Sequence, residues 1–265
     1  MALFVLPFVA PIYRVQFDVA TTVTVVSLFF AILVGFFIAG ATSNYLRLQT
    51  LIATEDGCLL AIYNFTKLIA PERLEKVCEA IDQYLIAVVE FDQLEYAAQT
   101  RKEMWKIVAE TDMVIPENPH ELSIYQDLHS TKSQLFAINQ EMALVAKPIV
   151  SSRHWLILIT LALLIGLLLL LLRDGVLLWD LVIGALLVVM YEVLTLVREI
   201  DDNTFFASQL MYDPPQAVFE AMGRLHYYPE VATKLGILKN EKRPYRLGYT
   251  KKTKRGSEKA IKIVK

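Results

Sequence analysis

The sequence has few of the side chains from which catalytic and metal sites are usually built. It contains two cysteines, Cys58 and Cys78, and four histidines at positions 120, 129, 154 and 226. Two cysteines exclude a disulfide-rich scaffold, and the histidine spacing does not match that of a zinc site. Phosphate-binding glycine loops, nucleophile elbows, HExxH and CxxC motifs are absent from the sequence. We therefore expect neither an enzyme nor a bound cofactor, metal or nucleic acid.

Charge is missing from three long stretches of the chain. Residues 19–40 carry no charged side chain, and at ~1.5 Å per residue a helix of this length crosses the ~30 Å hydrocarbon core of a bilayer. A second uncharged stretch covers residues 154–172, and a third, 181–197, is interrupted only by Glu192. The short "RDG" at 173–175 leaves room for a turn between the last two, which predicts a membrane hairpin. The sequence thus predicts an all-α, multi-pass membrane protein with a cytoplasmic helical stalk.

Basic residues predict the orientation of the hairpin. Lys147 and Arg153 precede it and Arg198 follows it, whereas the turn holds Arg173 alone. Segments rich in lysine and arginine face the cytoplasm. We therefore expect residues 41–152 and the C-terminal tail to be cytoplasmic in an integral, multi-pass membrane protein.

These patterns divide the chain into six segments. Residues 1–18 are apolar but too short to span, so we expect them at the membrane interface or packed against other helices. The others are a transmembrane helix (19–40), a cytoplasmic helical region (41–152), a transmembrane hairpin (153–198), a cytoplasmic segment after the membrane (199–238) and a basic tail (239–265).

The cytoplasmic region is predicted to form long helices. One of them carries an apolar seam with spacings of four and three residues, which we expect to be a contact between subunits. The seam consists of Leu74, Cys78, Ile81, Leu85 and Val88. After a break with two prolines at 115–121, a second helix is expected to run from about Glu121 to Lys147 and onward into the membrane hairpin.

Charge is divided unevenly between the stalk and the tail. Residues 55–147 contain sixteen Asp and Glu against eight Lys and Arg, a net charge of −8, whereas residues 239–265 contain eleven Lys and Arg against two Glu, a net charge of +9. A basic tail of this kind binds anionic lipid headgroups. Alternatively, the tail folds back on the acidic stalk of its own or of a neighbouring subunit.

Two groups of acids stand out near the membrane. Glu192 is the carboxylate inside the third apolar stretch, where an acid faces the protein interior or a watery cavity, or pairs with Arg153 or Arg198. Glu199, Asp201 and Asp202 follow directly after that stretch. They form either a cation site or a helix cap, and capping is the commoner role.

A resemblance to a known family rests on the sequence around the first apolar stretch. There "LVGFFIAGATSNYLRLQTLIATEDG" (33–57) joins a glycine-aromatic pair in the membrane to a polar helix. This resembles the pore helix of the bestrophins, and a helical cytoplasmic segment, a tight hairpin and an acidic stretch ending in Asn-x-Phe follow in the same order. The chain is similar to the bestrophin-like membrane family over about residues 24–225. It lacks the Pro-Phe-Gly and aspartate run of calcium-gated bestrophins.

The resemblance implies a pentameric anion channel whose neck is a ring of apolar side chains. Aligning Gly35 and Phe36 with the family motif puts the neck at Leu28, Ile32 and Phe36, which lie at i, i+4 and i+8 on one helix face. Gly35 would let neighbouring helices approach closely. The expected function is passive chloride conduction by a homo-oligomer.

Two other functions remain open from the sequence. One is a non-conducting, membrane-anchored interaction protein with the stalk as a docking surface and the basic tail on anionic lipid. The other is a proton-coupled carrier that uses Glu192.

Overall fold

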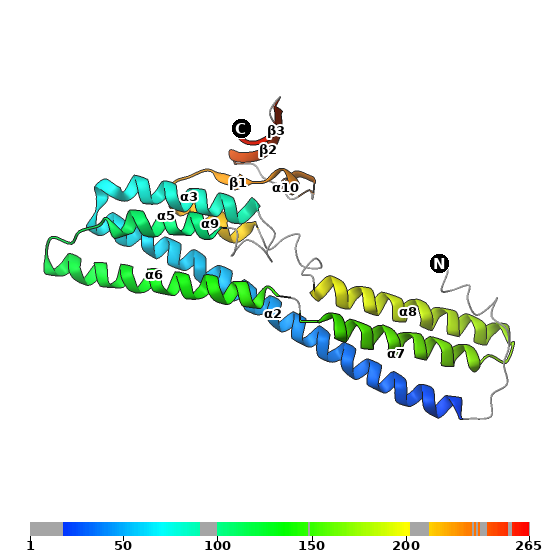
Figure 1. The fold of residues 1–265 in the computed structure, drawn as a ribbon. Helices are drawn as coiled ribbons and strands as arrows, with labels where there is room; N and C mark the ends of the chain where they lie inside the picture. The colour runs from blue at the N-terminus through cyan, green and yellow to red at the C-terminus, as the bar shows by residue number, and fades with distance from the viewer. Residues whose placement is uncertain are drawn as a thin grey trace. The chain divides into compact units, whose positions relative to one another are not determined.

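The first apolar stretch opens a single long helix, α2 (Val19–Ile69), that continues into polar sequence without a break (Figure 1). The computed structural model describes residues 18–90, 100–147, 149–201, 212–234, 236, 238, 243–253 and 256–264. Asp18 begins the helix by accepting hydrogen bonds from the Thr21 backbone N–H at 3.1 Å and the Thr21 hydroxyl at 2.5 Å. The helix ends just before Pro71, because the residue that precedes a proline disfavours helical backbone angles.

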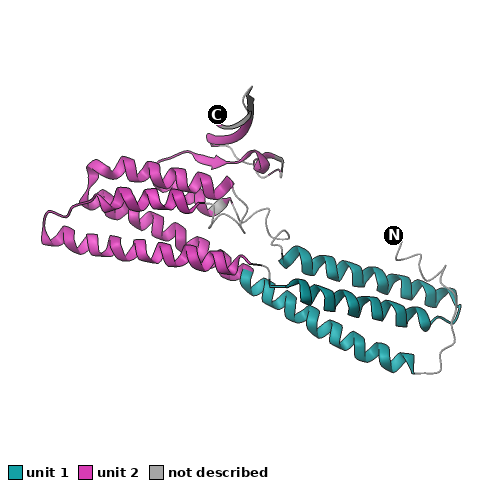
Figure 2. Cartoon of the chain, viewed as in Figure 1, with its two compact units in different colours: residues 1–44, 148–205 teal, residues 45–147, 206–265 magenta. Residues whose placement is uncertain are grey.

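One compact unit combines the first part of α2 with the predicted hairpin. It comprises residues 1–44 and 148–205 and contains α7 (Ser152–Leu171) and α8 (Leu177–Asp201) (Figure 2). Gly175 takes a φ of 82° in the turn between them, a conformation that costs glycine little. In the described part of the chain, α2, α7 and α8 are long and apolar enough to cross a bilayer. The predicted helical hairpin and the nearly all-helical fold are confirmed.

The second unit is a helical bundle built from the remainder of α2 and the segments outside the three candidate spans. It comprises residues 45–147 and 206–265. Its further helices are η1 (Pro71–Arg73), α3 (Leu74–Glu90), α5 (Arg101–Asp112), α6 (Pro119–Val145), α9 (Asp213–Ala221) and α10 (Glu230–Lys234). Their apolar faces meet in one core that includes the fully buried Leu59, Tyr84 and Phe219.

The apolar seam on α3 is core and not a subunit contact, so this expectation was wrong. Cys78, Ile81, Leu85 and Val88 are all buried inside the bundle, and α3 packs closely against α5. The spacing correctly predicted an apolar helix face, but other helices of the same chain cover it.

The expectation that the helix after residue 121 continues into the membrane was also wrong. α6 ends at Val145 and α7 begins at Ser152. The sequence has proline at position 148, which supplies no backbone N–H and disfavours helix at the residue before it. The start of α6 agrees with the predicted break, since Asn118 caps it by accepting a hydrogen bond from the Glu121 N–H at 2.9 Å.

The C-terminal part contains strands that the sequence analysis did not predict. β1 (His226–Tyr228) pairs in parallel with β2 (Tyr245–Thr253), which pairs antiparallel with β3 (Gly256–Val264). Arg246 on β2 makes a two-pronged ion pair with Asp82 on α3, with both N–O distances at 2.7 Å. Part of the basic tail therefore folds back on the acidic bundle of its own subunit, which was the alternative considered above.

Candidate functional site

The predicted neck residues form an uncovered apolar stripe on the membrane part of α2. Leu28, Ile32 and Phe36 are 60%, 59% and 67% exposed, respectively. The opposite face of the same helix is buried, with Val34 and Phe37 packed in a small core against α7 and α8. The stripe is free to line a pore, to face lipid or to contact another subunit.

Gly35 lies next to this stripe and has open space around it. A Cβ built at Gly35 meets nothing within 4 Å in the described part of the subunit. Close helix approach inside the subunit occurs instead at Gly166, where a Cβ would lie 3.3 Å from the Leu187 side chain. The predicted packing at Gly35 thus requires a partner outside the subunit, and it stays a prediction.

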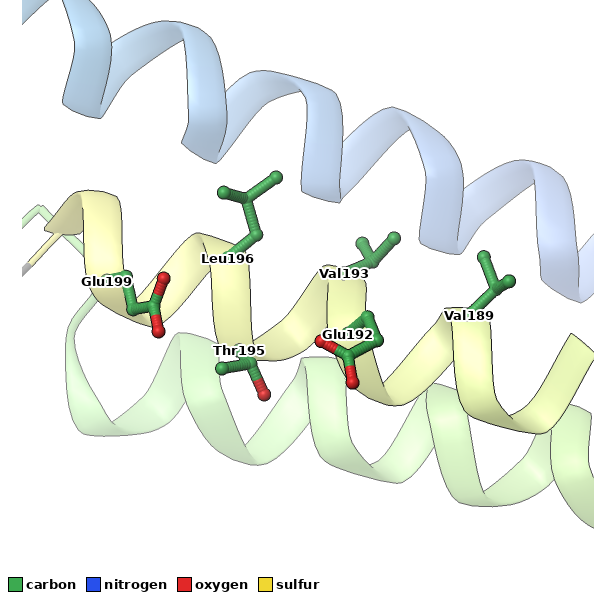
Figure 3. Close-up of a pocket in the computed structure, with 6 residues that line it drawn as sticks. All are labelled: Val189, Glu192, Val193, Thr195, Leu196 and Glu199. Atoms are coloured by element: carbon green, nitrogen blue, oxygen red, sulfur yellow. The ribbon is translucent and has the colours of Figure 1, made fainter. Parts of the chain in front are cut away.

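Glu192 lies on an exposed face of α8 beside an open groove of about 370 Å³. The groove is lined by Val189, Glu192, Val193, Thr195, Leu196 and Glu199 (Figure 3). Val189 and Val193 point toward α2, whereas Glu192 and Thr195 point away from it. The subunit therefore presents polar side chains on a membrane helix at a place that its own helices do not cover.

The acids at the end of α8 have separate surroundings. Asp201 is buried and accepts hydrogen bonds from the backbone N–H groups of Ile149 at 2.8 Å and Val150 at 3.2 Å, so it holds the chain that enters α7. Glu199 is exposed in the groove. Asp202 lies outside the described residues, and among the described residues no group of three or more His, Cys, Asp and Glu is placed to hold a metal.

Two buried acids in the helical bundle of the second unit were missed by the sequence analysis. Glu55 and Asp56 on α2 are 2% and 9% exposed. The Tyr84 hydroxyl donates a hydrogen bond to Glu55, whereas the buried Asp56 Oδ2 has no hydrogen-bond partner among the described residues. Burial, and after it the charge of Glu55, raises the pKa of Asp56 to about 8. The sequence signal was weak, because adjacent acids in a helix usually belong to a solvated surface.

Comparisons with known proteins agree with this membrane fold. A family model described as a bestrophin-like domain matches residues 9–202. No curated protein matches the chain. A crystal structure described as that of a membrane protein has a TM-score of 0.59 at 11% sequence identity, covering 84% of this chain and 96% of that chain. At this identity the likeness concerns the fold alone.

Proposed function

The chain belongs to the bestrophin-like family, and from this premise we propose that it forms an oligomeric channel that conducts small anions such as chloride. The family match covers most of the chain and indicates a membrane protein of channel type. The observation that carries the proposal is the uncovered stripe of Leu28, Ile32 and Phe36 on a membrane-spanning helix.

A conducting path requires several copies of this subunit. The three candidate spans of the described chain, α2, α7 and α8, are too few to enclose a water-filled path. A symmetric ring of subunits solves this by bringing the same face of α2 to a common axis. Members of the bestrophin family form such oligomers, and the resemblance favours a pentamer.

An apolar neck suits a gated anion path. Constrictions lined by apolar side chains close by dewetting, so a small change in radius switches conduction. The edge of an aromatic ring carries partial positive charge and favours an anion over a cation. Phe36, the most exposed of the three neck residues, is therefore the one that we assign to ion contact.

The acidic cytoplasmic bundle is less negative in effect than its composition suggests. Four of its acids form ion pairs with basic side chains of the same unit: Asp82 with Arg246, Glu141 with Arg47, Asp112 with Lys132 and Glu75 with Arg224. Pairing and burial reduce the repulsion that an anion meets near the protein. The stalk is thus compatible with anion passage.

Chloride flux from liposomes that contain the purified full-length protein tests the proposal. Leu28→Ala, Ile32→Ala and Phe36→Ala are each expected to raise the flux about tenfold, because a wider neck stays wet for longer. Ile115→Ala is the control, since Ile115 is 79% exposed between α5 and α6 and lies outside the candidate membrane spans, and its flux should equal that of the wild type.

Two results would contradict the channel. If no variant passes chloride or another small ion, the protein is better explained as a membrane-anchored interaction protein. If Ile115→Ala changes the flux as much as Phe36→Ala does, the effect is not specific to the stripe on α2 and the neck assignment is refuted.

A further inference from the structure

In the unit formed by residues 1–44 and 148–205, most charged side chains have a hydrogen bond or an ion pair within the subunit. Arg173 pairs with Asp180 at 2.7 Å, Asp18 and Asp201 accept backbone hydrogen bonds at helix ends, and Asp174 accepts one from Val176 at 3.0 Å. Among the described residues of the unit, two opposite charges have neither a hydrogen bond nor an ion pair. They are Glu192 on α8 and Arg153 at the start of α7.

Glu192 requires cover that its own subunit does not supply. It lies nine residues before Asp201, the last residue of α8, so it is about 13 Å inside that end of the helix at ~1.5 Å per residue. A carboxylate at this depth is costly when it faces lipid and is found against protein or water. The groove that holds Glu192 also contains the hydroxyl of Thr195 and the carboxylate of Glu199. The face is therefore polar along its length.

Arg153 lies on a different side of the subunit. It shares the exposed face of α7 with Leu156, Ile157 and Thr160, at steps of three and four residues. The buried face of α7, with Leu158 and Ile165, packs against the other two helices. The acidic face of α8 and the face of α7 with Arg153 consequently point in different directions and do not meet within one subunit.

The two faces match in depth. Asp201 at the end of α8 bonds to Ile149 and Val150 just before α7, so these residues mark one level at the start of α7 and the end of α8. From that level, Arg153 and Glu199 are about 4 and 3 Å into the membrane, and Thr160 and Glu192 about 15 and 13 Å, at ~1.5 Å per residue. Rotation about an axis normal to the membrane preserves depth, so the faces of neighbouring copies meet in register in a ring.

We propose that the α8 groove with Glu192, Thr195 and Glu199 receives the exposed α7 face of a second copy of this chain. Arg153 of the neighbouring copy lies at the level of Glu199, and Thr160 of that copy lies at the level of Glu192. This contact is heterologous, and a heterologous contact forms a ring when the rotation between neighbouring copies closes. The proposed function requires that closure, with the exposed stripe of α2 toward the axis. The proposal rests on the ring assembly of the proposed function and defines which surfaces build it.

Paired cysteines test the contact in membranes that contain the full-length protein. The matched variants are Arg153→Cys with Glu199→Cys and Thr160→Cys with Glu192→Cys. The mismatched control is Thr160→Cys with Glu199→Cys, whose positions differ in depth by about 12 Å. The native Cys58 and Cys78 are buried and remain in all variants.

Mild oxidation should cross-link the matched pairs into a series of covalent oligomers on a denaturing gel. The largest should contain as many subunits as the ring. Cross-linking should be at least about tenfold stronger than in the mismatched control, because a disulfide tolerates only short Cβ–Cβ distances. Each single-cysteine variant should remain monomeric on a denaturing gel, since a heterologous contact does not bring a residue against its own copy. A series of covalent oligomers from the mismatched pair, or none from either matched pair, overturns the proposal.

Charge reversal gives an independent measurement that does not depend on cysteine reactivity. Arg153→Glu and Glu199→Arg should each raise the dissociation constant between subunits in detergent about tenfold, which lowers the measured particle mass. The double variant should restore the wild-type mass. Equal masses for all three variants overturn the contact.

The outcomes separate this contact from the channel. Chloride flux without cross-linking leaves the proposed function intact and refutes the contact. Cross-linking into a series that ends at the ring size without flux supports the contact and refutes conduction.

Discussion

At the residue scale, Asp56 gives the bundle a dependence on pH that an exposed acid would not give. Its pKa is about 8 in the folded protein and about 3.9 in an unfolded chain. The folded state therefore holds a proton that the unfolded state releases between these values. The stability associated with Asp56 is complete below about pH 4 and is lost as pH rises toward 8.

Asp56→Asn should remove this loss, because the amide is neutral at every pH. Relative to wild type, we expect the stability of the variant to rise by about 4 kcal/mol between pH 5 and pH 9, at about 1.4 kcal/mol per pH unit up to the folded pKa. Thermal unfolding of both proteins in one detergent across this pH range measures the difference. Asp127→Asn, which replaces an exposed acid on α6, should show no such pH-dependent difference. A constant difference between Asp56→Asn and wild type across this range would contradict the assignment.

At the same scale, the sequence predicted which residues form an apolar stripe but not what covers them. Leu28, Ile32 and Phe36 were placed on one face by their spacing, and they do share an exposed face in the structure. Asp56 could not be found in this way, because its burial depends on helices that are distant in the sequence. Burial of a polar side chain is set by tertiary packing and leaves little local signal.

At the element scale, the hairpin between α7 and α8 was predictable because both apolar stretches are long and the turn is short. Its internal ion pair was not predicted. Arg173 and Asp180 are each 7% exposed in their side chains and contact each other at 2.7 Å. Trp179 donates from Nε1 to the Leu172 carbonyl at 3.1 Å and closes the same turn.

Breaking this pair on one side should cost more than removing both charges. Asp180→Asn leaves Arg173 buried without its counter-charge, and we expect a loss of about 3 kcal/mol, whereas Asp180→Leu with Arg173→Met should lose about 1 kcal/mol or less. Thermal unfolding of the three proteins in one detergent measures the difference. Equal losses would mean that Arg173 without its counter-charge carries no extra cost, which contradicts the prediction.

The strands of the C-terminal part could not be predicted from the charge composition of that segment. Eleven basic residues in 239–265 favoured a lipid-binding tail, but part of that segment forms β2 and β3 and pairs with β1. The partner strand β1 lies well before β2 in the chain. Because β2 pairs with a strand that is distant in the sequence, the local sequence showed mainly its positive charge and did not predict the pairing.

At the scale of the whole molecule, the two kinds of uncovered surface have one explanation. The apolar stripe of α2 and the polar groove of α8 are both left open by a subunit with too few spans to enclose a path. The ring that we propose would cover the groove with a neighbouring copy and turn the stripe toward the axis. A monomer would have to expose Glu192 to lipid, which is the costlier arrangement.

Mixing subunits distinguishes a shared central path from a path within each subunit. In a ring with one neck, each Phe36→Ala subunit widens the same constriction, so co-expression with wild type should give several conductance levels between those of the two pure proteins. The number of levels reports the number of subunits: a pentamer gives four intermediate levels, or six with the two pure proteins, if the arrangement of variants within the ring has no effect. Single-channel recording from planar bilayers measures these levels. If the mixture shows only the two pure conductances, each subunit or preformed assembly conducts by itself and the shared neck on α2 is refuted.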